Sequence, residues 1–156
     1  MGTRECPDAK GPRSISREDV PIAQATREGC VRPRVMLDTG ALIALERGQH
    51  SIRKVHRLAF ELGYPIVATT PVIAEWWRKG KREKDRMRIL RTLVVEPPDG
   101  HVARLAGAAI GLVAAGVVDA LVMASASLRG DTVYTSDMDD LVRLRDVFPG
   151  VQLERV

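Results

Sequence analysis

From Arg34 onward, short runs rich in β-branched and apolar residues alternate with segments of helical period. Strand-like runs occur at 34–37, 65–69, 93–96, 132–135 and 151–155. Between them, apolar residues recur every three or four positions, as on one face of a helix. Strands separated by helices require crossover connections, which produce a parallel sheet covered by helices on both faces. We therefore predict a three-layer α/β/α domain with a central, mainly parallel sheet of four to five strands.

Residues that begin and end helices divide these segments further. Helix-starting residues are expected at Thr39, Ser51, Thr70 and Ser136, with Pro71 in a first helical turn. Asp139, three residues after Ser136, is a weak capping-box partner. Glycines are expected to end helices at Gly48, Gly63 and Gly130.

The chain divides into two regions of different composition. Residues 1–33 are polar, charged and punctuated by proline and glycine, and we expect a flexible N-terminal arm that can be disordered. Residues 34–156 are long enough for one domain with one core. No apolar run reaches the roughly 20 residues that span a bilayer, and the N-terminus lacks a hydrophobic signal core. The expected location is therefore cytoplasmic, with no membrane partner.

The charge of the chain favours an anionic partner only weakly. The formal net charge is +4 and the sequence pI is about 9.4. The segment 78–91 holds eight basic residues and two acidic ones, a net charge of 8 − 2 = +6. Such a segment either follows a nucleic-acid backbone or forms a solvated helix face, and both interpretations stay open.

Four acidic residues lie where predicted strands end or predicted helices begin. They are Asp38, Glu75, Asp119 and Asp137. Charged side chains are rarely buried unless they are paired or bind a metal. In an open α/β sheet, ligands bind at the carboxyl ends of the strands, so these acids are expected to meet there. One shared acidic pocket would suit Mg²⁺ and phosphate-ester chemistry.

Each acid also has an ordinary structural interpretation. Asp38 would cap the helix that follows it, and Asp137 would be a turn residue. Asp119 would be a helix N-terminal acid favoured by the dipole, and Glu75 would pair with Lys79 four residues later. The four acids together, in this order and on these elements, favour the functional interpretation.

These residues resemble the PIN-domain family of ribonucleases, and most closely its VapC-type toxins from bacterial toxin–antitoxin pairs. The resemblance covers about 34–156 and rests on four motifs in order. They are Asp38-Thr39 after the first strand, Glu75 on the helix after Pro71, the run Asp119-Ala120-Leu121-Val122-Met123-Ala124, and Thr135-Ser136-Asp137 with a further acid at Asp139 or Asp140. The predicted domain is accordingly described as PIN-like.

The resemblance implies an Mg²⁺- or Mn²⁺-dependent endoribonuclease, the toxin of a type II pair. It implies Asp38, Glu75, Asp119 and Asp137 as catalytic residues, and Asp38, Asp119 and Asp137 as metal ligands. It also implies an RNA substrate, a homodimer and a cognate antitoxin that blocks the site. The hydroxyl groups of Thr39 and of Thr135 or Ser136 are expected to orient the acids.

Three other functions are compatible with parts of the sequence. Asp38-Thr39-Gly40 matches the Asp-Thr-Gly signature of aspartic proteases, which predicts a mostly β protein. A phosphoryl-transfer enzyme with a nucleophilic Asp is disfavoured because position 40 is glycine instead of a second acid. A non-catalytic PIN-like module that binds RNA or protein is the remaining alternative.

One of Trp76 and Trp77 is expected in the core, and the other in a dimer contact or stacked on a base.

Overall fold

A computed structural model describes residues 33–78 and 82–156. Most of the predicted N-terminal arm, together with Lys79 and Lys81 of the basic segment, lies outside these ranges. The elements follow in the order β1 (Val35–Leu37), α1 (Thr39–Glu46), α2 (His50–Glu61), β2 (Ile66–Thr69), α3 (Thr70–Trp76), α4 (Glu83–Leu90), β3 (Val94–Glu96), α5 (Gly100–Leu112), α6 (Val117–Arg129), β4 (Thr132–Thr135), α7 (Asp139–Arg145) and β5 (Gln152–Arg155).

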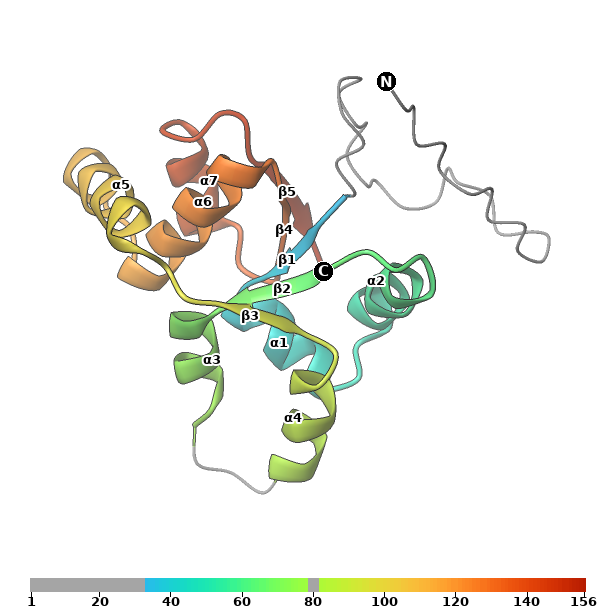
Figure 1. The fold of residues 1–156 in the computed structure, drawn as a ribbon. Helices are drawn as coiled ribbons and strands as arrows, with labels where there is room; N and C mark the ends of the chain where they lie inside the picture. The colour runs from blue at the N-terminus through green and yellow to red at the C-terminus, as the bar shows by residue number, and fades with distance from the viewer. Residues whose placement is uncertain (1–32, 79–81) are drawn as a thin grey trace, which may run out of the picture.

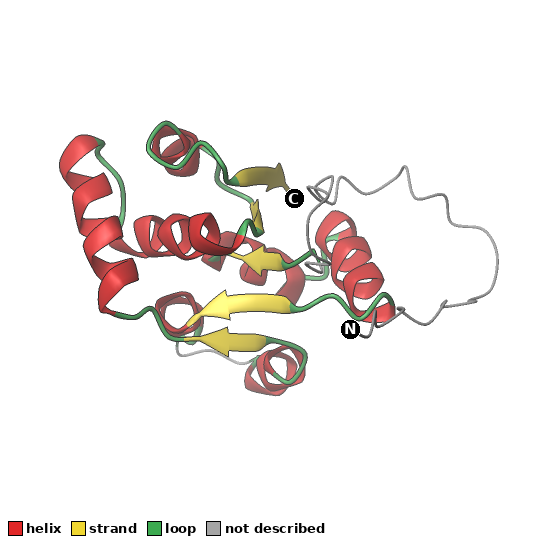
Figure 2. Cartoon of the chain, turned by 45° about the horizontal axis from the view of Figure 1, so that its top comes forward, coloured by secondary structure: helices red, strands yellow, loops and turns green. Residues whose placement is uncertain are grey.

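The five strands form one sheet in the order β3-β2-β1-β4-β5, and every pair of neighbours is parallel. Figures 1 and 2 show the strands side by side, with helices on both sides of the sheet. The predicted α/β/α class is therefore confirmed. The mostly β protein that the Asp-Thr-Gly match predicts is wrong, because Asp38 caps a helix between two parallel strands.

The strand order explains how the two sides of the sheet are covered. The chain goes outward from β1 to β2 and β3, and then returns to place β4 and β5 on the other side of β1. Crossovers between parallel strands are right-handed, so a reversal of direction moves the helices to the opposite face. In Figure 1, α5, α6 and α7 accordingly lie on one side of the sheet, and α1, α2 and α4 on the other.

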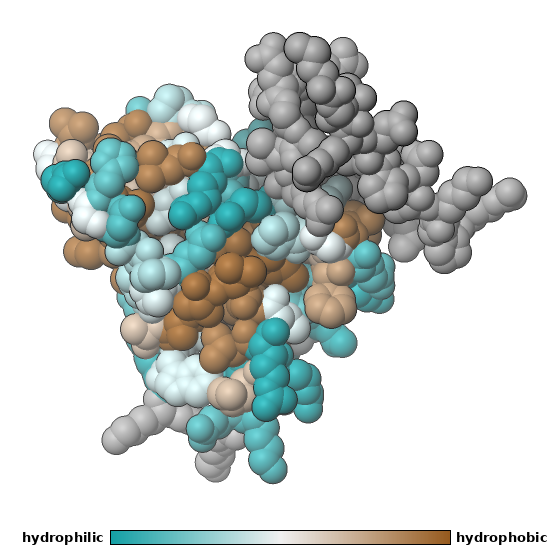
Figure 3. Space-filling view, viewed as in Figure 1, coloured by the Kyte–Doolittle hydropathy of each residue, from teal (hydrophilic) through white to brown (hydrophobic). Residues whose placement is uncertain are grey.

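Burial follows the position of each strand in the sheet. All residues of β1, β2 and β4 are buried, because these inner strands have neighbours on both edges and helices on both faces. The outer strands β3 and β5 are largely half-buried or exposed. Figure 3 shows an apolar patch in the middle of one face, over β3, where Val94 and Val95 are 47% and 39% exposed.

The predicted helix starts are partly wrong, whereas the predicted stops are confirmed. Gly48, Gly63 and Gly130 all have positive φ angles near the ends of helices. However, α2 begins at His50 after Gln49, and α7 begins at Asp139 after Met138, and neither capping residue makes a side-chain cap hydrogen bond. The expected caps at Ser51 and Ser136 are therefore wrong. The expected cap at Thr70 is wrong as well, because the N-cap position of α3 is Thr69 and Thr70 is the first residue of the helix. Among the described residues, no helix is long and apolar enough to cross a membrane.

Candidate acidic site

The strand order places a candidate site between β1 and β4. The chain reverses its direction of winding at these two neighbouring strands, which makes their carboxyl ends a topological switch point. Leu37 of β1 pairs with Tyr134 of β4, so Asp38 and Thr135 are the next residues of adjacent strands. The backbone N–H of Asp38 donates to the Tyr134 carbonyl over 3.2 Å. Asp38 and Asp137 therefore leave the sheet at the same edge.

Asp38 has a structural role as well as a place in the candidate site. It is the N-cap residue of α1, and its Oδ1 accepts a hydrogen bond from the N–H of Ala41 over 2.6 Å. The expected cap at Thr39 is wrong, because Thr39 is already the first residue of the helix. Asp38 as a residue is only 5% exposed, so folding places its charged carboxylate in a mostly buried position.

Asp137 lies in a tight turn after β4. The Thr135 hydroxyl donates to the Asp137 carbonyl over 2.7 Å and accepts from the Asp137 N–H over 2.9 Å. The Asp137 carboxylate accepts from the N–H of Asp139 over 3.3 Å. Gly40 approaches this turn closely, since a Cβ atom there would lie 2.3 Å from Ser136 Oγ. Glycine at position 40 therefore lets the start of α1 pack against the turn that carries Asp137.

Glu75 reaches the same region from α3. The Thr39 hydroxyl donates to Glu75 Oε2 over 2.7 Å, which links the first turn of α1 to α3. The predicted orienting role of Thr39 is consistent with this contact. The alternative pairing of Glu75 with Lys79 lies outside the described residues.

Asp119 lies in the first turn of α6, the helix that precedes β4. Its carboxylate folds back toward the start of its own helix, because a Cβ atom on Gly116 would lie 2.8 Å from Asp119 Oδ2. Burial, together with the charges of Asp140, Glu75 and Asp137, raises the pKa of Asp119 from its ordinary value to about 6. These couplings place Asp119 among the other acids.

The electrostatics of Asp38 connect the two sides of this group. Burial raises the pKa of Asp38 from its ordinary value to about 6. The nearby Thr135 hydroxyl and the hydrogen bond from the Ala41 N–H oppose this increase, while the charges of Asp119 and Asp137 contribute to it. Asp38, Glu75, Asp119 and Asp137, which we call the acid site, thus interact through space although they come from four separate segments.

The acid site lacks a compensating cation within residues 33–78 and 82–156. None of its four carboxylates forms an ion pair with a described residue. The described residues also contain no ready-made group of three acidic, histidine or cysteine side chains that could hold a metal ion. The carboxylate oxygens are the donor type that Mg²⁺ prefers, so the donor set suits a divalent cation.

Asp140 is a further acid near the site, and the sequence does not distinguish it from Asp139. Asp140 is the strongest charge acting on Asp119, and it also pairs with Arg143 one turn later on α7. Its position shortly after the Thr135-Ser136-Asp137 motif indicated a site residue, but Asp139 follows the same motif and was an equal candidate. Only the packing of α6 against α7 separates the two.

The two tryptophans and the basic helix occupy different environments. Trp76 is 2% exposed and belongs to the core, whereas Trp77 is 37% exposed. Their rings meet edge to face at 6.0 Å. In α4, Arg86 is half-buried and binds Glu46, while Lys84 and Arg88 are exposed. Sequence analysis missed the Arg86–Glu46 pair, because its partners are 40 residues apart.

Comparison with solved structures finds this fold in toxin–antitoxin complexes. A chain of the DNA-bound VapBC2 complex from Rickettsia felis has a TM-score of 0.63 and 18% identity, over 78% of this chain and 98% of that chain. For DNA-bound VapBC from Salmonella typhimurium the values are 0.62 and 19%, over 79% and 98%. For a toxin–antitoxin complex from Klebsiella pneumoniae they are 0.59 and 21%, over 75% and 94%.

The sequence comparisons add nothing to this likeness. No family model matches the sequence, and no curated protein matches it either. The identities of the solved structures are low, so the likeness concerns the fold. At that level the resemblance to VapC-type proteins is confirmed, and the chain has the PIN-like fold that is found in VapBC toxin–antitoxin complexes.

Proposed function

We propose that this protein is a metal-dependent endoribonuclease and the toxin of a type II toxin–antitoxin pair. The observation that carries the proposal is the acid site, where four carboxylates lie at the switch point of the sheet with no described cation beside them. Like charges gathered without a partner are costly to folding, so a ligand of opposite charge is expected. The fold of toxin–antitoxin proteins supports the same function.

Asp38, Asp119 and Asp137 are the proposed ligands of Mg²⁺ or Mn²⁺. Asp38 and Asp119 have pKa values raised to about 6, so both are mainly ionised at neutral pH and ready to bind a cation. Asp38 contributes the oxygen that the Ala41 N–H does not occupy. When bound, such a metal supplies polarisation of a phosphoryl oxygen and lowers the pKa of water.

The other residues of the site would act on the orientation of the reactants. Glu75 is the proposed group that orients the attacking water and receives its proton, and Thr39 holds the Glu75 carboxylate from the opposite helix. Thr135 fixes the turn of Asp137 through both of its hydroxyl contacts. The backbone at the switch point thereby presents the acids to a single phosphate.

RNA is the proposed substrate because a polyanion can bind both a cation at the acid site and basic side chains elsewhere on the surface. Exposed basic residues of α4, Lys84 and Arg88 among them, would contact phosphates without reading sequence. A homodimer is proposed as well, since the apolar patch over β3 is a surface that a protein partner can cover. The cognate antitoxin is the second proposed protein partner, because the similar folds come from complexes with antitoxins.

The test is RNA cleavage by the purified full chain in Mg²⁺ or Mn²⁺, with EDTA and with Asp38→Asn. Asparagine is as good an N-cap as aspartate, so this variant should keep α1 while it loses a metal ligand. Asp146→Asn, an exposed acid after α7, is the matched control and should cleave like the wild type.

Cleavage that EDTA and Asp38→Asn both abolish would support the proposal. Cleavage that persists in EDTA, or in Asp38→Asn, would overturn the metal-dependent mechanism. A folded protein that binds RNA without cleaving it in either metal would instead support the non-catalytic binding module.

A further inference from the structure

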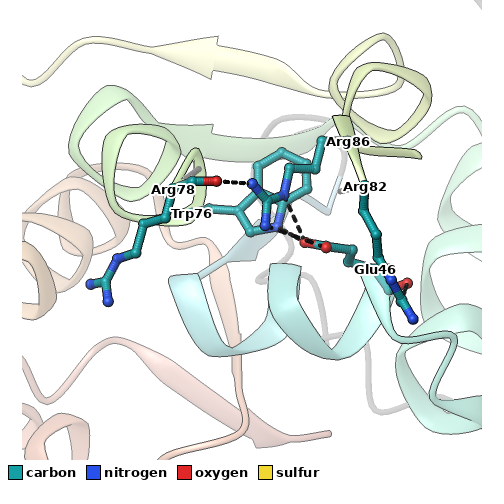
Figure 4. Close-up of polar contacts among 5 residues, drawn as sticks. All are labelled: Glu46, Trp76, Arg78, Arg82 and Arg86. Atoms are coloured by element: carbon teal, nitrogen blue, oxygen red, sulfur yellow. Dashed lines mark hydrogen bonds and ion pairs between the residues drawn. The ribbon is translucent and has the colours of Figure 1, made fainter. Parts of the chain in front are cut away.

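We infer that Glu46 is a positioning residue for Glu75, acting through Trp76 from the far end of α1. This inference rests on the proposed function, since it assigns Glu75 to the acid site. The helices α1 and α3 are joined next to the acid site by the Thr39–Glu75 hydrogen bond. Glu46 and Trp76 join the same two helices at a second point. Figure 4 shows the contacts at this second point, made by Glu46 of α1, Trp76 of α3, Arg86 of α4, and Arg78 and Arg82 between α3 and α4.

The Glu46 carboxylate accepts hydrogen bonds from two different helices. Trp76 Nε1 of α3 donates to Oε2 over 2.9 Å, and Arg86 Nε of α4 donates to the same oxygen over 3.0 Å. Arg86 also lies over the Trp76 ring, 6.0 Å from its centroid. Arg82 donates to the Glu46 carbonyl over 3.0 Å, and Arg86 donates to the Arg78 carbonyl. We call Glu46, Trp76, Arg82 and Arg86 the Glu46 cluster.

The cluster is placed to control the orientation of α3. Along α1, Thr39 is the first residue and Glu46 the last, a separation of about 10 Å at 1.5 Å per residue. Along α3, Glu75 and Trp76 are consecutive. Thr39 therefore binds Glu75 near the acid site, and Glu46 binds the neighbouring Trp76 at the other end of α1. The two contacts to α1 thus restrain α3 in addition to the core packing of Val72 and Trp76.

The second contact, between Glu46 and Trp76, is buried. The side chains of Glu46 and Arg86 are only 9% and 14% exposed, and Trp76 is 2% exposed. A buried carboxylate needs its partners, so Glu46 holds Trp76 and Arg86 in one geometry. The short helix α3, which has seven residues and no side-chain cap, depends on such tertiary contacts for its position.

Trp76→Phe tests the inference because it removes the indole N–H and keeps an aromatic ring beneath Arg86. With the full chain and Mn²⁺, we expect RNA cleavage to lose about tenfold in kcat with KM for RNA unchanged, as when a partner behind a site residue is removed. In a Glu75→Gln background, Trp76→Phe should cause no further loss, because the effect passes through Glu75. A purely structural role would add its loss in both backgrounds.

Trp77→Phe is the matched control, since the same substitution one residue later touches an exposed ring that makes no described polar contact. Crystal structures of the two variants without metal give a readout independent of activity. The Thr39–Glu75 hydrogen bond should be lost or lengthened in Trp76→Phe and kept in Trp77→Phe. If Trp76→Phe does not fold, Glu46→Ala and Glu46→Gln replace it. The Thr39–Glu75 hydrogen bond should then be kept only in Glu46→Gln, whose side-chain oxygen still accepts from Trp76.

The outcomes separate this inference from the proposed function. If the wild type cleaves RNA but the effects of Trp76→Phe and Glu75→Gln simply add, the positioning role is wrong and the nuclease stands. An intact Thr39–Glu75 contact in Trp76→Phe would overturn it equally. If the wild type cleaves no RNA while the contact is lost in Trp76→Phe alone, the positioning role stands and the nuclease is wrong.

Discussion

Two groups of charged side chains lie next to the sheet, and they differ in how their charge is balanced. Arg34, Glu96, Arg129 and Asp131, which we call the paired cluster, contain two cations and two anions. Arg34 lies 2.7 Å from Glu96 and 3.0 Å from Asp131, and Arg129 lies 3.3 Å from Glu96. In contrast, the acid site has four carboxylates and no described cation. The charges of the first group are balanced within the described residues, whereas those of the second are not.

The pKa values alone would not reveal this difference. Burial raises the pKa of Asp131 to about 6, the same value as for Asp38 and Asp119. At Asp131, however, the charges of Arg34 and Arg129 oppose the effect of burial. At Asp119, three further acids add to it. A perturbed carboxyl group therefore indicates function only when the neighbouring charges fail to compensate it.

The largest expected effect is on stability, in the paired cluster. Arg34→Met should lower the free energy of unfolding by about 3–5 kcal/mol, because it leaves the buried Asp131 carboxylate without its cation. Urea unfolding at pH 7.5 measures the change. Arg57→Met, which removes the exposed partner of Glu61, is the control and should cost under about 1 kcal/mol. An equally small loss in Arg34→Met would erase the distinction between the two clusters.

The same kind of change in the acid site should have the opposite sign. Asp38→Asn should raise the free energy of unfolding in EDTA at pH 7.5 by about 2 kcal/mol, since it removes a poorly solvated charge and keeps the helix cap. Saturating Mg²⁺ at 100 times Kd should stabilise the wild type by about 2.7 kcal/mol and the variant not at all. Thermal unfolding with and without Mg²⁺ measures both. A destabilised Asp38→Asn in EDTA would show that the charge is compensated after all.

An effect of intermediate size is expected in the pH dependence of stability and of Mn²⁺ binding at the acid site. The pKa values of Asp38 and Asp119 are raised from 3.8 to about 6, so the folded state takes up protons more readily than the unfolded chain. Their stabilising contribution is fully present below about pH 4 and is lost as the pH rises through about 6. Metal binding needs the ionised form, so Mn²⁺ affinity should rise at least about tenfold between pH 5 and pH 7.5. Calorimetric titration at the two pH values checks this, and a pH-independent affinity would contradict it.

The smallest expected effect concerns Arg143, which pairs with Asp140 beside the acid site. Both side chains are largely exposed, so Arg143→Ala should change the free energy of unfolding by under about 1 kcal/mol. It should also strengthen Mn²⁺ binding by about two- to threefold, because it leaves the charge of Asp140, which acts on Asp119, without its partner. Titrations in low and high salt measure the change. Arg145→Ala on the same helix is the control, and an equal change there would point to net charge alone.

The sequence predicted the parts of the molecule that depend on local pattern. The five strand runs, the parallel sheet and the position of Asp38 after β1 follow from periodicity and from crossover connections. The caps at Ser51 and Ser136 were wrong, because α2 already begins at His50 and α7 begins only at Asp139. Local pattern likewise carries no information about contacts between distant segments. Arg86 and Glu46 are 40 residues apart, and neither has a signal of its own in the sequence.

The most direct test of the difference between the two clusters is Mn²⁺ binding measured by calorimetry at pH 7.5. The wild type and Glu96→Gln, a carboxylate of the paired cluster, should bind Mn²⁺ with the same affinity, provided that both are folded. Asp119→Asn should lose that binding. A wild type that binds no Mn²⁺, or an Asp119→Asn variant that binds it as tightly as the wild type, would contradict the account.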